Sequence, residues 1–388
     1  MKKLTEYIDG REAEMLAFLE KVVNIDSGTH DKAGVDAVGE LLSGRLRQLG
    51  FQVERSPQTQ YGDHLVARKL GKGSRRILFV GHMDTVFPAG TAARRPFRIE
   101  GGRAYGPGVL DMKGGDVSLL YALEALKETG SRFYGEVSMT VIFNSDEEVL
   151  SPTSKTIIEA EAKRADSACV FEPARPGGEY VARRKGVGKY YLTVHGRAAH
   201  AGAQPEAGRS AVGELAHKII AIHGLTDFGT GTTLNVGLVK GGERSNVVAE
   251  TAYAEIDLRV PDIGEAARVD ARMREIAGSS TVPDTTAELS GGLDFPPMVE
   301  TPASRKLLEA VQAAGRQLGL DLKGILTGGG SDGNHTSQHT PTVDGMGPKG
   351  SETHSDREFI EVATLAERTK VTALFLDLWP TVIETLDR

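Results

Sequence analysis

Hydrophobic residues follow two periods along the chain, and their alternation predicts a mixed α/β protein. Several segments carry apolar residues at the three-to-four-residue spacing of an amphipathic helix. Short runs rich in β-branched and aromatic residues lie between them and predict buried strands. We expect helices over 4–24 (one or two), 34–49, 113–129, 153–164, 209–224, 263–277, 302–318 and 362–378. We expect a hairpin over 51–70 and strands over 76–80, 136–143, 167–171, 189–195, 232–240 and 249–260.

The order of these elements predicts a doubly wound, mostly parallel sheet that is interrupted by a second unit. Strands alternate with helices up to residue 171, which is the pattern of an open parallel α/β sheet. Near residue 177 the composition shifts to a linker rich in Gly and Pro. We therefore predict one α/β domain built from 1–182 and 292–388, with a smaller α+β domain, 183–291, inserted into it.

Composition and charge narrow the class of protein. Of the 388 residues, 39% are hydrophobic and 26% are charged, so the chain can bury a large core. The net charge of −7 and the absence of long basic blocks argue against nucleic acid and anionic membranes as partners. No apolar run approaches the roughly 20 residues that span a bilayer, and we recognise no signal peptide. We expect a cytoplasmic protein whose single cysteine, Cys169, is a buried structural thiol.

Residue types that bind metals follow three of the expected buried strands. His82 comes after 76–80, Glu147 and Glu148 come after 136–143, and Glu172 comes after 167–171. Because the carboxyl ends of parallel strands share one edge of a sheet, we expect these side chains to meet. Carboxylates crowded on one edge repel each other unless a cation lies among them. The pattern therefore favours a metal site over a set of solvated loop residues.

Three further residues complete the candidate site. Asp84 lies two residues after His82 and can orient its ring. Asp111 follows a Gly-Pro-Gly turn, and His354 lies in a late Gly-rich loop. Two imidazoles and three carboxylates, without a thiolate, suit zinc, manganese or cobalt. Five ligands exceed one tetrahedral site and suit two ions that share a carboxylate, with Glu147 as the general base.

Seven motifs occur in order along nearly the whole chain: HMDTV, YGPGVLDMKGG, SDEE, FEP, GRAAHAG, TGGGSDGN and ETHSDRE. Together they resemble the aminoacylase/carboxypeptidase family of di-zinc metallopeptidases, and within it the glutamate carboxypeptidase (carboxypeptidase G) branch. The resemblance implies that His82 and Glu172 bind one zinc, that Glu148 and His354 bind the other, and that Asp111 bridges both. It also implies a cis peptide bond between Asp111 and Met112.

The resemblance also gives roles to the inserted unit, which would be a lid and dimerisation domain. It implies a homodimer through 183–291, in which His200 stabilises the carbonyl oxyanion in the partner's active site. Asn246 and Arg259 match positions that hold the substrate's carboxylate, although Arg259 could equally form a structural salt bridge. The backbone N–H groups of Gly328, Gly329 and Gly330 could bind the same carboxylate.

We therefore expect a hydrolase that cleaves an amide bond next to a free carboxylate in a small peptide or N-acyl amino acid. It would release a C-terminal amino acid or deacylate an N-acyl amino acid. Two alternatives are an aminopeptidase on di- or tripeptides with the same metal core and a non-catalytic binding protein of the same fold. Leu326 stands where the glutamate-releasing branch is expected to carry an arginine. We therefore expect substrates that end in neutral residues to compete with those that end in glutamate.

Overall fold

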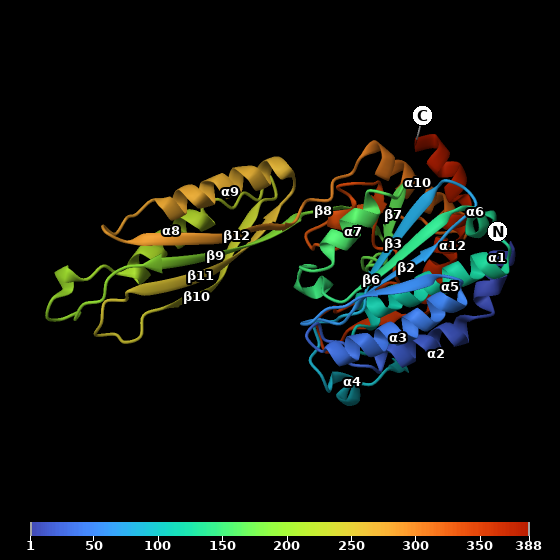
Figure 1. The fold of residues 1–388 in the computed structure, drawn as a ribbon, viewed down its shortest axis with the longest axis horizontal. Coiled ribbons are helices and arrows are strands. Elements are labelled where there is room, and N and C mark those ends of the chain that lie inside the picture. Colours follow the sequence, from blue (N-terminus) through green and yellow to red (C-terminus); the bar gives the residue numbers. More distant parts are fainter. Residues whose placement is uncertain (1, 387–388) are drawn as a thin grey trace. The chain divides into compact units, whose positions relative to one another are not determined.

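The computed structural model describes residues 2–386 and divides into two units (Figure 1). Unit 1 contains the chain up to Arg183, Val299–Leu326 and the chain from Ser331 onward, and unit 2 contains Arg184–Met298 and Thr327–Gly330. The predicted end of the inserted unit, residue 291, is wrong because the strand β12 (Thr286–Phe295) belongs to unit 2. The periodicity missed β12 because this edge strand contains Gly291 and Gly292, which are depleted in strands.

The main sheet of unit 1 has six strands in the order β1-β2-β6-β3-β7-β14. Their bounds are β1 (Gln52–Ser56), β2 (His64–Lys69), β3 (Arg76–His82), β6 (Ser138–Asn144), β7 (Ser167–Val170) and β14 (Thr342–Val343). Strand β3 pairs in parallel with both β6 and β7, and β14 is parallel to β7. The predicted hairpin, β1 and β2, forms the antiparallel edge. The predicted mostly parallel sheet is therefore confirmed.

Both faces of this sheet are covered by helices, as the alternating side chains of β3 require. Ile77 and Phe79 join the larger core, and Leu78 and Val80 join a smaller core beneath α7 (Lys155–Ala162). Helices of the larger core are α1 (Lys2–Asp9), α2 (Glu12–Val23), α3 (Lys32–Gln48), α5 (Gly114–Glu128), α6 (Arg132–Glu136), α10 (Pro302–Arg316) and α12 (Val362–Leu386) (Figure 1). Cys169 is buried there, as predicted, and burial raises the pKa of its thiol.

A second, smaller sheet of unit 1 brings together two loops that are far apart in the sequence. Its order is β15 (Gly350–Ser351), β16 (Phe359–Glu361), β5 (Arg103–Tyr105) and β4 (Arg98–Glu100). Strand β16 pairs antiparallel with β5, so the loop before β16 lies beside the segment that follows β5. The first of these loops carries His354, and the second segment carries Asp111 within the short element Val109–Lys113, where the backbone of Asp111 itself is extended (φ −113°, ψ 96°).

Short elements elsewhere are α4 (Thr91–Arg94), α11 (Gly333–Thr336) and the pair β8 (Tyr180–Arg184) and β13 (Gly324–Thr327).

The C-terminal helix α12 runs further than the sequence predicts. We expected it to end near residue 378, but it continues to Leu386 with Pro380 inside it. Trp379 is fully buried, its indole N–H donates to the Ser167 hydroxyl (2.8 Å), and its ring packs edge-on against Phe133 at 5.9 Å. The stabilisation from this packing outweighs the loss of the backbone hydrogen bond that a proline removes from a helix.

Unit 2 is a four-stranded antiparallel sheet with two helices on one face, which confirms the predicted α+β unit (Figure 1). The strand order is β10 (Thr233–Gly241), β11 (Thr251–Val260), β9 (Gly186–His195) and β12, with helices α8 (Ala211–His223) and α9 (Ile263–Gly278). Alternate residues of β11, among them Ile256 and Leu258, enter the core with the two helices. Asp257 and Arg259 therefore lie on the opposite face of the sheet.

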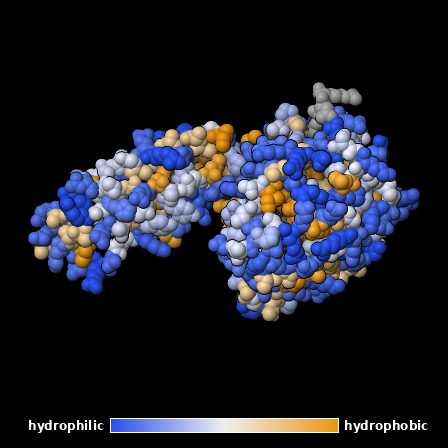
Figure 2. Space-filling model, viewed as in Figure 1, coloured by the Kyte–Doolittle hydropathy of each residue, from blue (hydrophilic) through white to orange (hydrophobic). Residues whose placement is uncertain are grey.

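No helix within residues 2–386 is both long enough and apolar enough to cross a membrane. Hydrophilic residues cover most of the visible surface of each unit, and apolar residues form smaller patches between them (Figure 2).

Candidate metal centre

Strands β3, β6 and β7 end side by side, and the residues that follow them meet at one edge of the sheet, as predicted. His82 is the last residue of β3 and pairs with Asn144 at the end of β6. Glu147 and Glu148 follow β6 in a short helical turn. Glu172 follows β7, and its Oε1 lies 3.6 Å from His82 Nε2. The parallel register thus places an imidazole and three carboxylates at one edge.

Asp111 lies between the two histidines. Its Oδ1 is 3.3 Å from His82 Nε2, and its Oδ2 is 3.2 Å from His354 Nε2. His354 Nε2 is also 3.2 Å from Glu148 Oε2. One carboxylate therefore faces two groups of donors, His82 with Glu172 and His354 with Glu148. The peptide bond between Asp111 and Met112 is cis, as the resemblance implied.

Asp84 orients the His82 ring and also anchors the turn that carries the two glutamates. His82 Nδ1 lies 3.0 Å from the Asp84 carbonyl oxygen, so this nitrogen carries the proton and Nε2 points at the carboxylates. The Asp84 carboxylate accepts the backbone N–H groups of Glu147 (3.2 Å) and Glu148 (3.3 Å). It also accepts the hydroxyl of Thr29 (2.8 Å). A contact of this kind behind a ligating histidine fixes its tautomer and ring orientation.

Burial and mutual repulsion of the carboxylates dominate the electrostatics of this edge. Burial first, and then Glu172, raises the pKa of Glu147 well above its ordinary value. Burial also raises the pKa of Glu148. For Asp111 burial acts in the same direction, but its close contacts with the imidazole rings of His354 and His82 outweigh the effect of burial and lower the pKa. Asp111 and Glu148 in turn raise the pKa of His354 to about 10. Excess negative charge at a buried site is what a cation would neutralise.

The residues present fit a divalent metal site. His82 Nε2 and Glu148 Oε1 are buried and have no hydrogen-bond partner within residues 2–386. Ligand atoms of His82, Asp111 and Glu148 lie within 4.8 Å of one another, and so do those of His82, Glu147 and Glu172. The nitrogen–oxygen separations of 3.2 to 3.6 Å agree with the roughly 3.4 Å between ligands of a tetrahedral zinc. Imidazole and carboxylate donors suit zinc, cobalt or manganese.

Two buried aspartates that the sequence analysis did not assign hold the turn of Glu147 and Glu148. Asp146 accepts the backbone N–H of Thr153 (2.7 Å) and the hydroxyl of Ser154 (2.5 Å). Asp332 accepts the side-chain amide of Asn144 (2.7 Å) and the hydroxyl of Ser151 (2.6 Å). Ser151 has a left-handed φ of 51°, which few non-glycine residues adopt. Asp332 is the acidic residue of the TGGGSDGN motif, so this motif could have indicated it from the sequence.

Glu358 holds the Asp111 loop and was also missed. Its carboxylate accepts the backbone N–H groups of Gly108 (3.1 Å), Leu110 (2.8 Å) and Asp111 (3.0 Å). Gly108 has φ of 71°, a conformation that favours glycine. The last residue of the ETHSDRE motif is Glu358, so one loop supplies both His354 and the carboxylate that positions Asp111.

Unit 2 brings His200 and Asn246 together. The backbone N–H of Ala201 donates to the Asn246 carbonyl oxygen (3.0 Å), next to a bridge between His200 and Val247. His200 Nδ1 accepts the N–H groups of Gly202 and Ala203, each at 3.1 Å. An accepting Nδ1 leaves the ring proton on Nε2, which makes that atom a hydrogen-bond donor.

Arg259 forms the salt bridge that the sequence analysis left open. Its Nε and Nη2 donate to the two carboxylate oxygens of Asp257, each at 2.9 Å, and its Nη1 lies 3.4 Å from the Gly328 carbonyl oxygen. These three contacts use three of the five guanidinium N–H donors of Arg259, so two donors remain for a ligand. The carbonyl oxygens of Gly329 and Gly330 accept from Arg184 Nη1 (3.0 and 3.1 Å).

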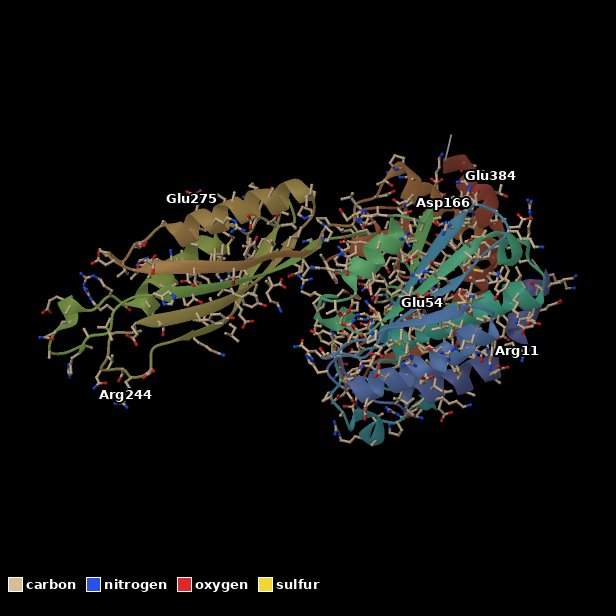
Figure 3. The ribbon with its side chains drawn as sticks, viewed as in Figure 1. Arg11, Glu54, Asp166, Arg244, Glu275 and Glu384 are labelled. Atoms are coloured by element: carbon tan, nitrogen blue, oxygen red, sulfur yellow. The ribbon has the colours of Figure 1, made fainter. Side chains whose placement is uncertain are left out.

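The two groups of candidate residues in unit 2 lie at opposite ends of β11. Arg259 is the ninth of its ten residues, and the loop of Asn246 precedes the first, Thr251. Because a strand rises about 3.3 Å per residue, roughly 30 Å separate the two ends. Figure 3 marks Arg244 in the same loop as Asn246, beyond the ends of β10 and β11. Asn246 and Arg259 of one chain therefore cannot hold the same carboxylate.

This fold and this cluster define a metallohydrolase, and comparison with known proteins gives the family. Residues 78–378 match the model of the peptidase family M20/M25/M40, to which the chain belongs. The chain is 34% identical to carboxypeptidase G2 of Pseudomonas sp. (strain RS-16) over 370 residues, which cover 93% of this chain and 88% of that protein. The family, the fold class and the prediction of a hydrolytic enzyme are thereby confirmed.

Two other relatives show how widely the fold is used. The chain is 29% identical over 391 residues to the succinyl-diaminopimelate desuccinylase of Rhodospirillum centenum (strain ATCC 51521 / SW), with 94% of this chain and 97% of that protein covered. The crystal structure of the aminopeptidase PepT from Bacillus cereus ATCC 10987 matches with a TM-score of 0.77 at 24% identity, covering 94% of this chain and 98% of that one. Family membership alone therefore does not name the substrate.

Proposed function

We propose that this enzyme is a two-metal amidohydrolase that cleaves an amide bond next to a free carboxylate. It releases a C-terminal amino acid or deacylates an N-acyl amino acid. The observation that carries the proposal is Asp111, whose Oδ1 and Oδ2 lie 3.3 and 3.2 Å from the Nε2 atoms of His82 and His354. His82 with Glu172 and His354 with Glu148 would each hold one ion, Zn²⁺ in our proposal, with Co²⁺ or Mn²⁺ as alternatives. Such ions polarise a carbonyl and acidify a water molecule.

Glu147 is the proposed general base. It lies in the same cluster as His82 and Glu172, and burial with the neighbouring Glu172 raises its pKa. A raised pKa allows a carboxyl group to accept a proton from water and release it near neutral pH. Glu147 would pass that proton to the amide nitrogen as the leaving amine departs. Asp84 keeps the base in place through its hydrogen bond to the Glu147 N–H.

The substrate's carboxylate is assigned to Arg259, with the Gly328–Gly330 backbone beside it. Arg259 keeps two N–H donors for an anion after its contacts with Asp257 and Gly328. A charge-assisted bond to arginine is stronger than a neutral one, and a substrate without the carboxylate would not form it. Such a substrate should therefore be hydrolysed less efficiently.

His200 and Asn246 are assigned to the active site of a second copy of the chain. The donor Nε2 of His200 suits a carbonyl oxygen on which negative charge develops. The roughly 30 Å between the loop of Asn246 and Arg259 within one chain favours contributions from two protomers. The enzyme would therefore be a homodimer through unit 2, with His200 acting in trans.

Hydrolysis assays on a matched substrate panel test this function. The zinc-loaded enzyme is given N-acyl amino acids, their C-terminal amides and methyl esters, and dipeptides with a free amino terminus. We expect the free acids to exceed their amides and esters in kcat/KM by about 10- to 100-fold. Substrates that end in neutral residues should compete with those that end in glutamate. Preference for free-amino dipeptides whose C-terminus is blocked would contradict the proposal in favour of an aminopeptidase.

A further inference from the structure

A cleft in unit 1 borders Glu148 and is not used by the roles assigned so far. It is lined by residues 28–31, 85–89 and 148–149 and has a volume of about 550 Å³. We infer that this cleft receives the acyl group of the substrate and selects uncharged apolar or aromatic acyl groups over anionic ones. The inference rests on the proposed amidohydrolase function and adds its acyl specificity.

The position and size of the cleft suit the acyl side of the scissile bond. Glu148, assigned to one metal ion, lies in its wall, so a carbonyl carbon at the metal centre would extend its substituent into the cleft. Clefts of roughly 300 to 1,000 Å³ are typical of small-molecule sites. The leaving amino acid carries a carboxylate that needs a cationic partner. The cleft therefore suits the uncharged part of the substrate.

The wall of the cleft is mostly apolar. Val86 is 42% exposed, Pro88 and Ala89 are also exposed, and Val149 is partly exposed directly after Glu148. A single exposed valine needs no explanation, but a group of apolar side chains around one hollow marks a binding site. Covering such surface with an apolar ligand is favourable because it removes apolar area from water.

The charges around the cleft oppose an anionic acyl group. Asp31 lines it, and no lysine or arginine occurs among the described residues of its lining, whereas the charge of Glu148 is assigned to a metal ion. Lys32, the next residue after Asp31, pairs with Asp36 (3.0 Å) and Asp63 instead. His30 contributes a ring that lies 5.6 Å from the ring of Tyr61. A succinyl group would bring a second carboxylate beside Asp31 without a lysine or arginine side chain to pair with it.

The two main walls of the cleft, segments 28–31 and 85–89, are joined by backbone hydrogen bonds, so the cleft is preformed. The Thr29 N–H donates to the Thr85 carbonyl oxygen (3.1 Å), and the Thr85 N–H donates to the Ser27 carbonyl oxygen (2.8 Å). A β-carbon at Gly28 would lie 2.4 Å from the Phe87 carbonyl oxygen, so the close approach of these walls requires glycine. A rigid site costs less conformational entropy on binding than one that must be ordered.

Substitution of Val86 by lysine tests the inference. N-benzoyl, N-acetyl and N-succinyl derivatives of one amino acid are compared by kcat/KM, and their affinities for the Glu147→Gln variant are measured by calorimetry. We expect the wild-type enzyme to favour benzoyl over succinyl by about 10-fold or more. Val86→Lys should lower this ratio by about 10-fold, because it supplies the missing cation. Ala89→Lys, at a second exposed position of the same wall, should act in the same direction.

The matched control is Leu70→Lys. Leu70 is 79% exposed and follows Lys69, which pairs with Met139 near the start of β6, at the opposite edge of the sheet from His82. This variant should keep the wild-type ratio. A wild-type enzyme that prefers succinyl, or a ratio that neither Val86→Lys nor Ala89→Lys changes, would overturn the inference while leaving the amidohydrolase function intact. Failure of the metal-loaded enzyme to hydrolyse any acyl amino acid would instead overturn the proposed function.

Discussion

The carboxylate of Asp84 accepts the backbone N–H of Glu147 at 3.2 Å, while the carbonyl oxygen of the same residue lies 3.0 Å from His82 Nδ1. One residue thus connects a proposed metal ligand to the proposed general base. His82 ends β3 and Glu147 lies in the turn that follows the neighbouring parallel strand β6, and Asp84 keeps their relative position independent of substrate. This rigidity is what a metal hydrolase needs, because small displacements of reacting groups cost rate steeply.

Replacement of Glu147 by glutamine should keep the metal and remove most of the turnover. The amide cannot take a proton from water, and loss of a general base typically costs 10²- to 10⁴-fold. The measurement is kcat together with metal content by elemental analysis. Glu54→Gln, on the edge strand β1 (Figure 3), is the control and should be silent. A Glu147→Gln enzyme with near wild-type kcat would mean that the base is another residue.

Asp111→Asn should weaken the binding of both ions, because each carboxylate oxygen faces a different histidine. We expect the wild-type enzyme to bind two equivalents of zinc and the variant to lose affinity for both. His354→Ala should weaken mainly one, because it faces Glu148 and only one oxygen of Asp111. Competition with a chromogenic chelator measures both affinities. A wild-type stoichiometry of one ion per chain would contradict the two-metal assignment.

Asp332→Asn should lower kcat by on the order of 10- to 100-fold without removing the metal. Asparagine cannot accept from both Asn144 and Ser151 as the carboxylate does, so the turn that carries Glu147 loses part of its support. Steady-state kinetics and metal content are compared with those of Asp321→Asn, whose side chain is 90% exposed. Unchanged kcat in Asp332→Asn would show that Asp146 and Asp84 suffice to hold the turn.

Mixing His200→Ala with Glu147→Gln should restore activity if His200 acts in trans. Each variant alone is expected to be inactive, but one site of a heterodimer would combine an intact Glu147 with the partner's intact histidine. Random exchange of subunits would make roughly a quarter of all sites competent. Light scattering establishes the dimer, and labelled subunits establish exchange. No recovery after proven exchange would place His200 in its own chain's site or outside catalysis.

Acid should destabilise unit 1 through His335. Burial above all lowers the pKa of this histidine to about 4, below the roughly 6.5 of an unfolded chain. Between these values the unfolded state binds a proton that the folded state does not, so stability falls as the pH drops from about 6.5 toward 4. The loss is at most about 3 kcal/mol. Urea unfolding of His335→Asn should show a shallower pH dependence, whereas the exposed His217→Asn should match the wild type. Identical pH profiles for all three proteins would contradict the assignment.

The local pattern of the sequence determined the main sheet and the residues at its edge. A run such as Ile77–Val80 is buried on both faces, and a parallel sheet must bring the ends of such runs together. The positions of His82, Glu148 and Glu172 follow from that constraint alone. The same reasoning failed where the pattern is weak or overridden, at the Gly-containing strand β12 and at Pro380, which Trp379 packing holds within α12.

Only the tertiary structure decided how these residues are held. Asp332 reaches Asn144 across 188 residues, and Glu358 reaches the Asp111 backbone across 247. Periodicity describes neighbours along a helix or strand, so it carries no information about contacts at such separations. The cleft beside Glu148 likewise arises from how loops pack. The pairing of Arg259 with Asp257 and the separation of Arg259 from Asn246 are instead local to strand β11. The chemistry was readable from residue types, whereas its geometry depended on burial and on long-range hydrogen bonds.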